Sequence, residues 1–425
     1  MSSGNDELPT PDILRGLSQP RFSRRQLLQA AGWGGAALGA GALLSACGVA
    51  GTGAQAKTTK SSIEKFWAGK KKTGVVNWAN WPLYIDVSST NKDDHPSIDL
   101  FEKHYGIKVH YYEVIQDEGP FFAKVEPSLQ AHQYTGYDVA VITNGIYFTK
   151  YVELGWFIPL DHSLLPNFNK YAATKYKHEG FDPGNVYSIP WQSGFTGIGY
   201  NPKYVGEDIN SYWDLFNPKY KGHIGMFGNN DDLPNSILVA MYGDPAKTGP
   251  KQWRAAAKRL NEQKPLVRQY FTQNYIESLK SGDLWISQAW SGDIFQANAS
   301  GGSNLKFVIP KEGGVIWTDN LTLLKYAQNP VSGMLLMDWY YRPEIAAMVA
   351  EYVNYITPVP DARQWVDKDA AKAKGSNKAS LEYIAKSPLV FPTAAEYHET
   401  YNYRVLTNKE LSVWNSIFEP IYLGA

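Results

Sequence analysis

The sequence is poor in the residues that support redox, metal or nucleic-acid chemistry. Its 425 residues include a single cysteine, Cys47, so the chain cannot form an internal disulfide. The eight histidines show no ligand-like cluster. Basic and acidic residues both number 41, and without net charge or a basic block the chain is not expected to bind nucleic acid.

Sequence signatures of common enzyme classes are also missing. There is no Gly-x-Ser-x-Gly turn, no phosphate-binding loop and no His-Glu-x-x-His pair. Acidic residues occur along the whole chain, but without a spacing that selects a hydrolase. We therefore expect no catalytic residue, no cofactor and no resident metal ion.

The start of the chain has the features of an export signal. Arg24 and Arg25 form a twin-arginine pattern, and the Gly/Ala/Leu-rich residues 30–46 carry no charge. Residues 44–48, Leu-Ser-Ala-Cys-Gly, resemble a lipobox in which Cys47 is lipidated and becomes the mature N-terminus. We predict a signal peptide over residues 1–46 and a flexible tether over residues 47–72. The protein would then be lipid-anchored on the outer face of the cytoplasmic membrane, whether or not export uses the twin-arginine route.

From residue 73 onward, strand-like and helix-like segments alternate, which favours an α/β fold. The largely apolar residues 137–142 predict a strand of a parallel sheet covered on both faces. This strand ends at Thr143-Asn144-Gly145, a loop at the carboxyl end of the strand, where such sheets hold ligands. A polar loop at residues 229–235 is predicted to start a helix with its N-cap near Asp232.

Residues 311–320 suggest a binding site for an organic cation. Trp317 and Asp319 are two positions apart, so in a strand they would point to the same face. An indole face attracts positive charge, and a carboxylate accepts the N–H donors of an ammonium group. On these residues alone, the alternative that Trp317 is ordinary core and Asp319 caps a turn stays open.

Seven landmarks in order resemble one known family. The chain is similar to the extracellular solute-binding proteins of ABC importers, closest to the spermidine/putrescine-binding group, over nearly all of residues 73–425. The landmarks are Asn77-Trp78, Tyr137-Asp138, Tyr187-Ser188-Ile189-Pro190-Trp191, Pro218-Lys219-Tyr220-Lys221-Gly222, Pro310-Lys311-Glu312-Gly313-Gly314, Arg342-Pro343 and Tyr355-Ile356-Thr357-Pro358.

The resemblance implies a periplasmic-binding-protein-like fold of type II, an α/β architecture with a ligand cleft between two lobes joined by crossover strands. We expect residues 73–193 and 319–360 in lobe I, and residues 194–318 and 361–425 in lobe II. The crossovers would then be the segment at Gly194 and the stretch from Trp317 to Asp319.

The resemblance also implies the ligand-binding residues. Asp319 matches the acid that grips an amine, Asp232 a second acid, and Asn235 a position where a glutamate is usual. The exchange at Asn235 would remove one negative charge and favour a smaller or less charged amine. As alternatives, Asp232 could serve as a helix N-cap, and the aromatic residues could pack between the lobes. The expected aromatic box is Trp78, Trp81, Trp290, Trp317 and Tyr355, and the expected hydroxyl positions are Thr143 and Thr272.

The function implied is a monomeric, lipid-anchored receptor that captures a polyamine, such as putrescine or spermidine, or a similar small cation. It would pass this ligand to an ABC permease in the membrane. A ferric-ion receptor is the alternative, because related ferric-binding proteins use paired tyrosines and this chain has Tyr111-Tyr112 and Tyr340-Tyr341. Neighbours in a strand or a helix point in different directions, which disfavours both pairs as ligands. Some proteins of this fold use a catalytic cysteine, but Cys47 belongs to the lipobox.

Overall fold

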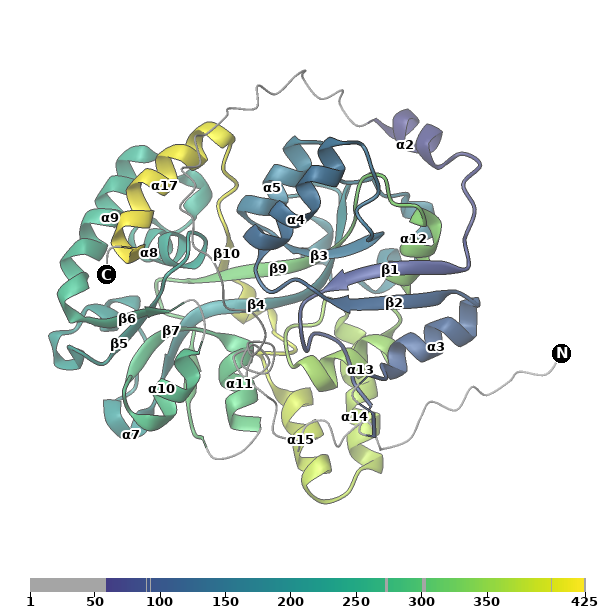
Figure 1. The fold of residues 1–425 in the computed structure, drawn as a ribbon. Helices are drawn as coiled ribbons and strands as arrows, with labels where there is room; N and C mark the ends of the chain where they lie inside the picture. Colours follow the sequence, from purple (N-terminus) through teal and green to yellow (C-terminus); the bar gives the residue numbers. More distant parts are fainter. Residues whose placement is uncertain are drawn as a thin grey trace, which may run out of the picture.

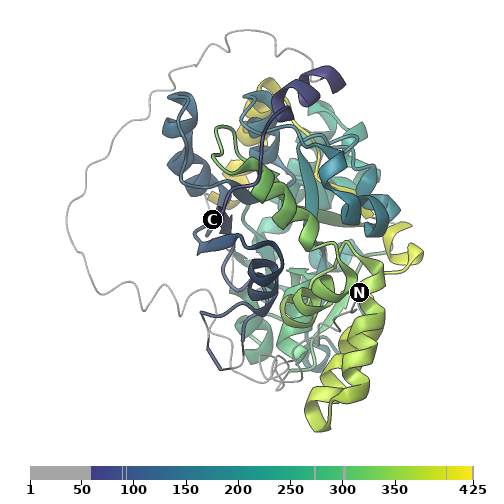
Figure 2. The same ribbon diagram turned by 90° about the vertical axis from the view of Figure 1, so that its right-hand side faces the viewer.

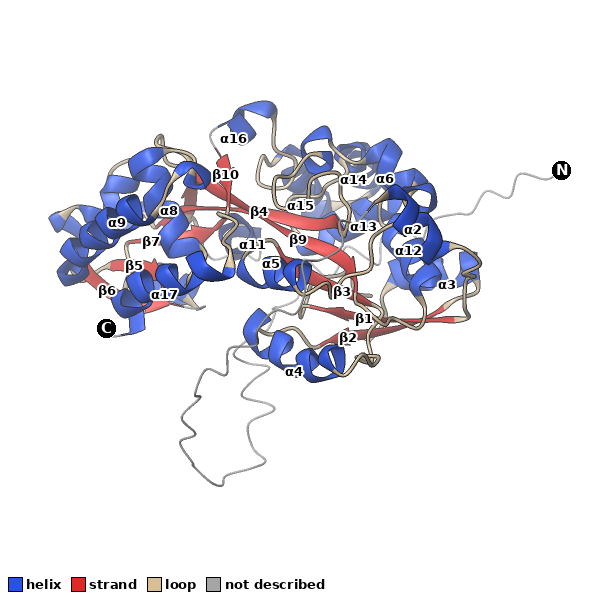
Figure 3. Ribbon diagram, turned by 90° about the horizontal axis from the view of Figure 1, so that it is seen from above, coloured by secondary structure: helices blue, strands red, loops and turns tan. Residues whose placement is uncertain are grey.

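The computed structural model describes residues 59–88, 90–91, 93–271, 274–299, 303–398 and 400–423 (Figure 1). The predicted signal peptide, Cys47 and Thr272 lie outside these residues. The described chain forms one sheet that runs through two lobes, with helices packed around it (Figures 1 and 3).

The sheet has ten strands, of which eight follow the order β2-β1-β3-β9-β4-β7-β5-β6, while β8 pairs with β4 and β10 with β9. The strands are β1 (Val75–Asn80), β2 (Lys108–Glu113), β3 (Val139–Thr143), β4 (Ser188–Tyr200), β5 (Ile224–Phe227), β6 (Val267–Phe271), β7 (Ile286–Trp290), β8 (Lys306–Val308), β9 (Gly314–Leu323) and β10 (Thr400–Asn402).

Two long antiparallel strands, β4 and β9, join the lobes. Every residue of both strands is buried, as expected for strands covered on both faces. The second half of β9 lies between β3 and the first half of β4 in lobe I, while residues 196–200 of β4 pair with β7 in lobe II. The pairing register shifts between Pro190 and Gln192. Gly194 and Trp317, which belong to the two predicted crossovers, pair with each other within these strands.

Lobe I contains more of the chain than the sequence suggested. Residues 362–390 contribute Val366, Leu381 and Ile384 to the same hydrophobic core as β1 and β3, so their assignment to lobe II is corrected. Figure 2 shows this yellow-green pair of helices, α14 and α15, extending from the rest of the ribbon. The helices of lobe I are α3 (Pro96–Tyr105), α4 (Glu118–Gln130), α5 (Ile146–Glu153), α6 (Pro166–Tyr171), α12 (Pro330–Trp339), α13 (Pro343–Val353), α14 (Arg363–Lys372) and α15 (Gly375–Lys386).

Lobe II has its own core around β5 and β7, built with Trp253, Leu260 and Trp414. Its helices are α7 (Pro202–Val205), α8 (Asp232–Tyr242), α9 (Pro250–Gln263), α10 (Tyr275–Ser281), α11 (Ser291–Ala299) and α17 (Asn408–Leu423).

The predicted tether is partly ordered. Helix α2 (Lys60–Trp67) begins at Thr59, which forms a capping box with Ser62. Trp67 is buried in the lobe I core, and its indole N–H donates to the carbonyl of Pro159 at 2.8 Å. Residues 60–67 are thus a docked helix, which corrects the expectation of a flexible segment there.

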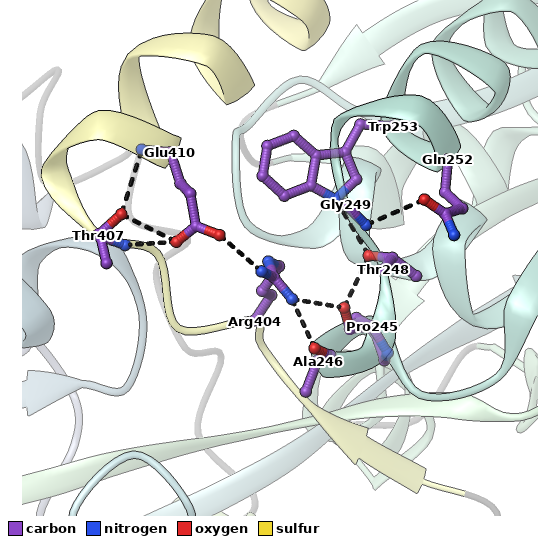
Figure 4. A network of polar contacts seen from close by, with 9 residues as sticks. All are labelled: Pro245, Ala246, Thr248, Gly249, Gln252, Trp253, Arg404, Thr407 and Glu410. Carbon is purple, nitrogen blue, oxygen red and sulfur yellow. Dashed lines mark hydrogen bonds and ion pairs between the residues drawn. The ribbon is translucent and has the colours of Figure 1, made fainter.

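The C-terminal segment returns along the crossover strands before it enters lobe II. After the short helix α16 (Ala394–His398), β10 pairs in parallel with Gly314–Ile316 of β9. Arg404 then fastens the segment to lobe II through Glu410 and through the carbonyls of Pro245 and Ala246 (Figure 4).

Candidate functional site

Trp317 and Asp319 lie at the point where β9 crosses between the lobes. Asp319 pairs with Thr143 of β3 and Trp317 with Gly194 of β4. Trp317 is 8% exposed and Asp319 is 6% exposed. Tyr355 links the two residues, because its ring lies 5.3 Å from that of Trp317 and 5.9 Å from that of Tyr84, which bonds to Asp319.

Both oxygens of Asp319 accept hydroxyl hydrogen bonds. The Tyr84 hydroxyl donates to Oδ2 and the Thr143 hydroxyl to Oδ1, each at 2.5 Å. Thr143, predicted as a hydroxyl position at the edge of the pocket, is thus a direct partner of Asp319. Tyr84 was not predicted, and its place in the aromatic loop after β1 was the only signal that pointed to it.

Two glycines leave room for the aromatic rings. A Cβ added to Gly194 would lie 2.8 and 2.9 Å from Cη2 and Cε2 of Trp317. A Cβ added to Gly292 would lie 2.7 Å from Cδ1 of Tyr355. Real Cβ atoms do not approach other carbons so closely, so both rings depend on a glycine beneath them.

Asp293 is a further acid beside the aromatic rings. It accepts a hydrogen bond from the Tyr355 hydroxyl at 3.1 Å and one from the Tyr275 hydroxyl at 3.0 Å. The Tyr275 oxygen in turn accepts the backbone N–H of Trp290 at 2.8 Å. The sequence analysis missed Asp293, although it follows β7 by three residues and strand ends of this kind often hold ligands.

Asp232 is the buried centre of a hydrogen-bond network. Its Oδ1 accepts from Thr196 at 2.6 Å and from Tyr403 at 2.7 Å, while its Oδ2 accepts from Asn229 at 2.9 Å and from Nε1 of Trp290 at 3.1 Å. Burial raises the pKa of Asp232, and these donors act in the opposite direction. Asp232 thus orients the Trp290 indole, and the neighbouring Asp231 is the N-cap residue of α8.

Asn235 is turned toward the protein rather than toward Asp319. Its Nδ2 donates to the carbonyl of Asp231 at 2.8 Å, and its Oδ1 accepts the backbone N–H of Arg404 at 2.9 Å. The residue is 1% exposed. The structure therefore corrects the interpretation of Asn235 as a pocket residue that lacks a charge.

Two other acids lie close to the crossover. Glu118, the first residue of α4, accepts the backbone N–H of Thr143 at 2.6 Å, and burial with the nearby Asp231 and Asp319 raises its pKa well above its usual value. Burial and the adjacent Asp232 raise the pKa of Asp231 to about 7. Within the described ranges, Glu118, Asp231 and Asp232 form no ion pair with a basic side chain. The surroundings of these three acids therefore favour a positively charged ligand.

The two N-terminal tryptophans of the predicted aromatic box lie elsewhere. Trp78 is fully buried in the lobe I core, where it packs edge to face against Trp191 and Tyr111. Trp191 in turn donates its indole N–H to the carbonyl of Tyr84 at 3.2 Å, so Trp78 is connected to Tyr84 through Trp191. The indole N–H of Trp81 donates to the carbonyl of Val141 in β3, also at 3.2 Å. These contacts correct the placement of Trp78 and join Trp81 to the lobe I core.

Tyr340 and Tyr341, one of the two tyrosine pairs that suggested a ferric site, make other contacts. Tyr340 packs against Trp78 and Trp191, and the Tyr341 hydroxyl donates to the carbonyl of Pro190. In the part of the chain that the structure describes, no three His, Cys, Asp or Glu residues are grouped to hold a metal ion. No helix among the same residues is long and apolar enough to cross a membrane.

Known proteins resemble this chain in both sequence and structure. The Escherichia coli spermidine/putrescine-binding periplasmic protein is 29% identical over 296 residues, which cover 69% of this chain and 80% of the relative. The putrescine-binding periplasmic protein SpuD of Pseudomonas aeruginosa is 31% identical over 299 residues, 66% of this chain and 77% of the relative.

Solved structures share the two-lobed α/β fold. The spermidine/putrescine substrate-binding protein PotD from Streptococcus pneumoniae, in complex with calcium and HEPES, superposes with a TM-score of 0.68 at 22% identity, covering 83% of this chain and 99% of that one. A putative spermidine/putrescine ABC transporter protein from Listeria monocytogenes gives 0.66 at 26% identity, with 83% and 100% coverage. These structures confirm the predicted fold class.

The relatives are solute-binding transport proteins rather than enzymes, as expected from the sequence, and they give the ferric alternative no support. The profile of one protein family, described as bacterial extracellular solute-binding protein, matches residues 136–387. This match covers more than half of the chain, and the chain therefore belongs to the bacterial extracellular solute-binding protein family.

Proposed function

We propose that this protein is the substrate-binding component of an ABC importer and captures a polyamine, such as putrescine or spermidine, between its lobes. The observation that carries the proposal is the group formed by Asp319, Trp317 and Tyr355 at the crossover, with Asp293 bonded to Tyr355. The polyamine-binding relatives support the same ligand class.

The chemistry of a polyamine matches this group of residues. Its ammonium groups need carboxylates, and its methylene chain needs flat apolar walls. Asp319 and Asp293 would accept ammonium N–H groups, while Trp290, Trp317 and Tyr355 would cover the methylenes. Each cation–aromatic contact contributes about 0.5–2 kcal/mol, the larger values applying once water is excluded.

Ligand capture would proceed by closure of the lobes about β4 and β9. The ligand bridges residues from both lobes, so it binds the closed form more tightly and shifts the population toward it. In an open form without ligand, water would solvate the carboxylates, which avoids the cost of burying them without a partner cation. The closed form would then dock on a membrane permease and release the ligand.

We further propose that the mature protein is exported and anchored through lipid on Cys47, and that it acts as a monomer. The lipobox and twin-arginine pattern support export, as does the periplasmic location of its relatives.

Titration calorimetry on residues 59–425 tests the proposal. The protein is unfolded and refolded to remove bound ligand, and α2 is kept because it is part of the lobe I core. The panel contains putrescine, spermidine, spermine, arginine, γ-aminobutyrate, ferric citrate and a few sugars. One-to-one binding of a di- or polyamine supports the proposal, and binding of another ligand with no response to any amine overturns it.

A further inference from the structure

A contact away from the aromatic rings joins the two lobes directly. Asp231 precedes α8 in lobe II, and Gly145 and Ile146 begin α5 in lobe I. The Asp231 carboxyl group faces the backbone N–H of Ile146, which acts to lower the pKa of that carboxyl. A Cβ added to Gly145 would lie 3.1 Å from Oδ1 of Asp231. The Ile146 side chain also packs against the hydrophobic core of lobe II, so Ile146 of lobe I contacts lobe II.

Lobe II holds the loop before Asp231 in a fixed position. The carbonyl of Asn230 accepts the Trp414 indole N–H at 2.9 Å, and its side-chain oxygen accepts the Tyr422 hydroxyl at 2.8 Å. The Asn230 amide donates to Glu419 at 2.9 Å. All three partners belong to α17, so Asp231 moves with lobe II as one rigid unit.

On the other side of the contact, the N-terminus of α5 is tied to the binding site. Thr143 donates its hydroxyl to Asp319, and the side-chain oxygen of Asn144 accepts the backbone N–H of Thr318 at 2.6 Å. Residues 143–145 thus contact the crossover strand β9 at one end and Asp231 at the other. Figures 1 and 3 show α5 on the side of lobe I that faces lobe II.

We propose that Asp231 is a positioning residue that latches the lobes together, holding the N-terminus of α5 with its carboxyl group and so stabilising the closed form. The latch joins protein to protein, and it acts whether or not a ligand is bound. A carboxyl oxygen suits this place as an acceptor, because the first N–H groups of a helix have no partner within the helix.

The latch should respond to pH, because several acidic groups surround Asp231. Asp232 lies beside it on α8, Glu118 approaches from α4, Tyr147 from α5, Tyr422 from α17 and Tyr403 from the C-terminal segment. Glu419 of α17 bonds to the neighbouring Asn230. In the closed form, burial and Asp232 raise the pKa of Asp231 to about 7, against an ordinary value of 3.8 for a carboxyl that faces water, as Asp231 would in an open form. At a pH between these two pKa values, closure therefore adds a proton to Asp231. The closed form is favoured below pH 4 and loses this advantage as the pH rises through 7.

The test measures closure without ligand. Small-angle scattering gives the radius of gyration of the mature, ligand-stripped protein from pH 5.5 to 8.0. We expect the closed-to-open ratio to fall about tenfold or more over this range. Asp231→Asn keeps an acceptor for the Ile146 N–H but cannot ionise, so its ratio should change much less. Asp244→Asn is the matched control, because Asp244 accepts the Ala246 N–H within lobe II alone.

A second pair of variants tests the latch without changing an acid. Ile146→Pro removes the N–H donor at the first position of α5, where proline is tolerated. Ile146→Ala removes the same side chain but keeps the donor. The proline variant should be more open than the alanine variant at pH 5.5, where the latch favours the closed form. The latch is refuted if Asp231→Asn keeps the wild-type pH profile, or if the two Ile146 variants are equally open. A failure of every amine to bind would refute the proposed function but leave this comparison intact.

Discussion

Gly194 and Trp317 face each other across the two strands that connect the lobes, and the indole lies where a side chain at position 194 would be. The ring is thereby placed at the hinge, next to Tyr355 and two residues from Asp319. The missing side chain at Gly194 thus leaves the space that the Trp317 ring occupies.

Gly194→Ala should move the Trp317 ring and weaken ligand binding. The added methyl would overlap the indole, and overpacking of this kind costs about 1–3 kcal/mol. We expect roughly tenfold weaker binding of the amine by calorimetry if about half of that cost falls on the bound form. Tryptophan fluorescence should change even without ligand.

Gly74→Ala is the matched control for this substitution, because a Cβ at Gly74 would meet no atom within 4 Å. It should leave both affinity and fluorescence at the wild-type values. Equal affinity for the two alanine variants would show that Trp317 does not contact the ligand.

Asp319→Asn should reduce affinity far more than it reduces the stability of the fold. The substitution removes the charge that would pair with an ammonium group, and a charge-assisted hydrogen bond contributes about 1.5–3 kcal/mol. Affinity should therefore fall roughly 10- to 150-fold, while the urea midpoint changes little. Asp361→Asn, at an exposed site on lobe I, controls for a change in net charge. Unchanged calorimetric affinity in Asp319→Asn would remove this residue from the site.

The crossover was predictable because its signals are local. Trp317 and Asp319 are two residues apart, and the alternation of a strand is enough to place them on one face. Thr143 ends an apolar strand, which predicts its position at the edge of a ligand-binding site. Resemblance to the family then indicated that these separate segments meet.

The residues that were misplaced depend on contacts between distant parts of the chain. Asn235 binds the backbone of Arg404, 169 positions away, and no local pattern reveals that partner. Trp78 lies on the core side of β1, where a buried indole and a ligand-facing indole have the same sequence pattern. Residues 362–390 follow the last crossover in sequence, but their apolar faces fit the lobe I core.

Asn235→Asp should destabilise the fold instead of improving the capture of a longer polyamine. The new carboxyl could still accept from Arg404, but it would face the carbonyl of Asp231 without a donor and lie near two other acids. An unsatisfied buried polar group costs about 1–3 kcal/mol, and more when it is charged. Because burial raises the pKa of such a carboxyl, the loss should grow as the pH rises.

Denaturant unfolding at pH 5 and pH 8 measures this loss, with Asn261→Asp at an exposed position of α9 as the control. Tighter spermidine binding by Asn235→Asp, with unchanged stability, would restore the interpretation of position 235 as part of the pocket.

Cys47→Ser should release the protein from membranes while leaving ligand affinity unchanged. Serine cannot form the thioether that carries the lipid, and Cys47 precedes the first described helix by more than ten residues. Fractionation of cells and labelling with a radioactive fatty acid measure the effect. Continued lipid labelling of the serine variant would overturn the lipobox interpretation.

Trp67→Ala should detach α2 from lobe I. The substitution removes a buried indole and its hydrogen bond to Pro159, and loss of a large buried aromatic side chain costs about 3–5 kcal/mol. An eight-residue helix is not stable alone in water, so residues 60–67 should unfold once the indole no longer holds them. Hydrogen exchange should become fast over α2 and stay slow in β1, because the lobe I core keeps its other members. Lys65→Ala, on an exposed face of the same helix, should leave exchange in α2 slow. Slow exchange in both variants would mean that contacts other than the indole hold the helix on lobe I.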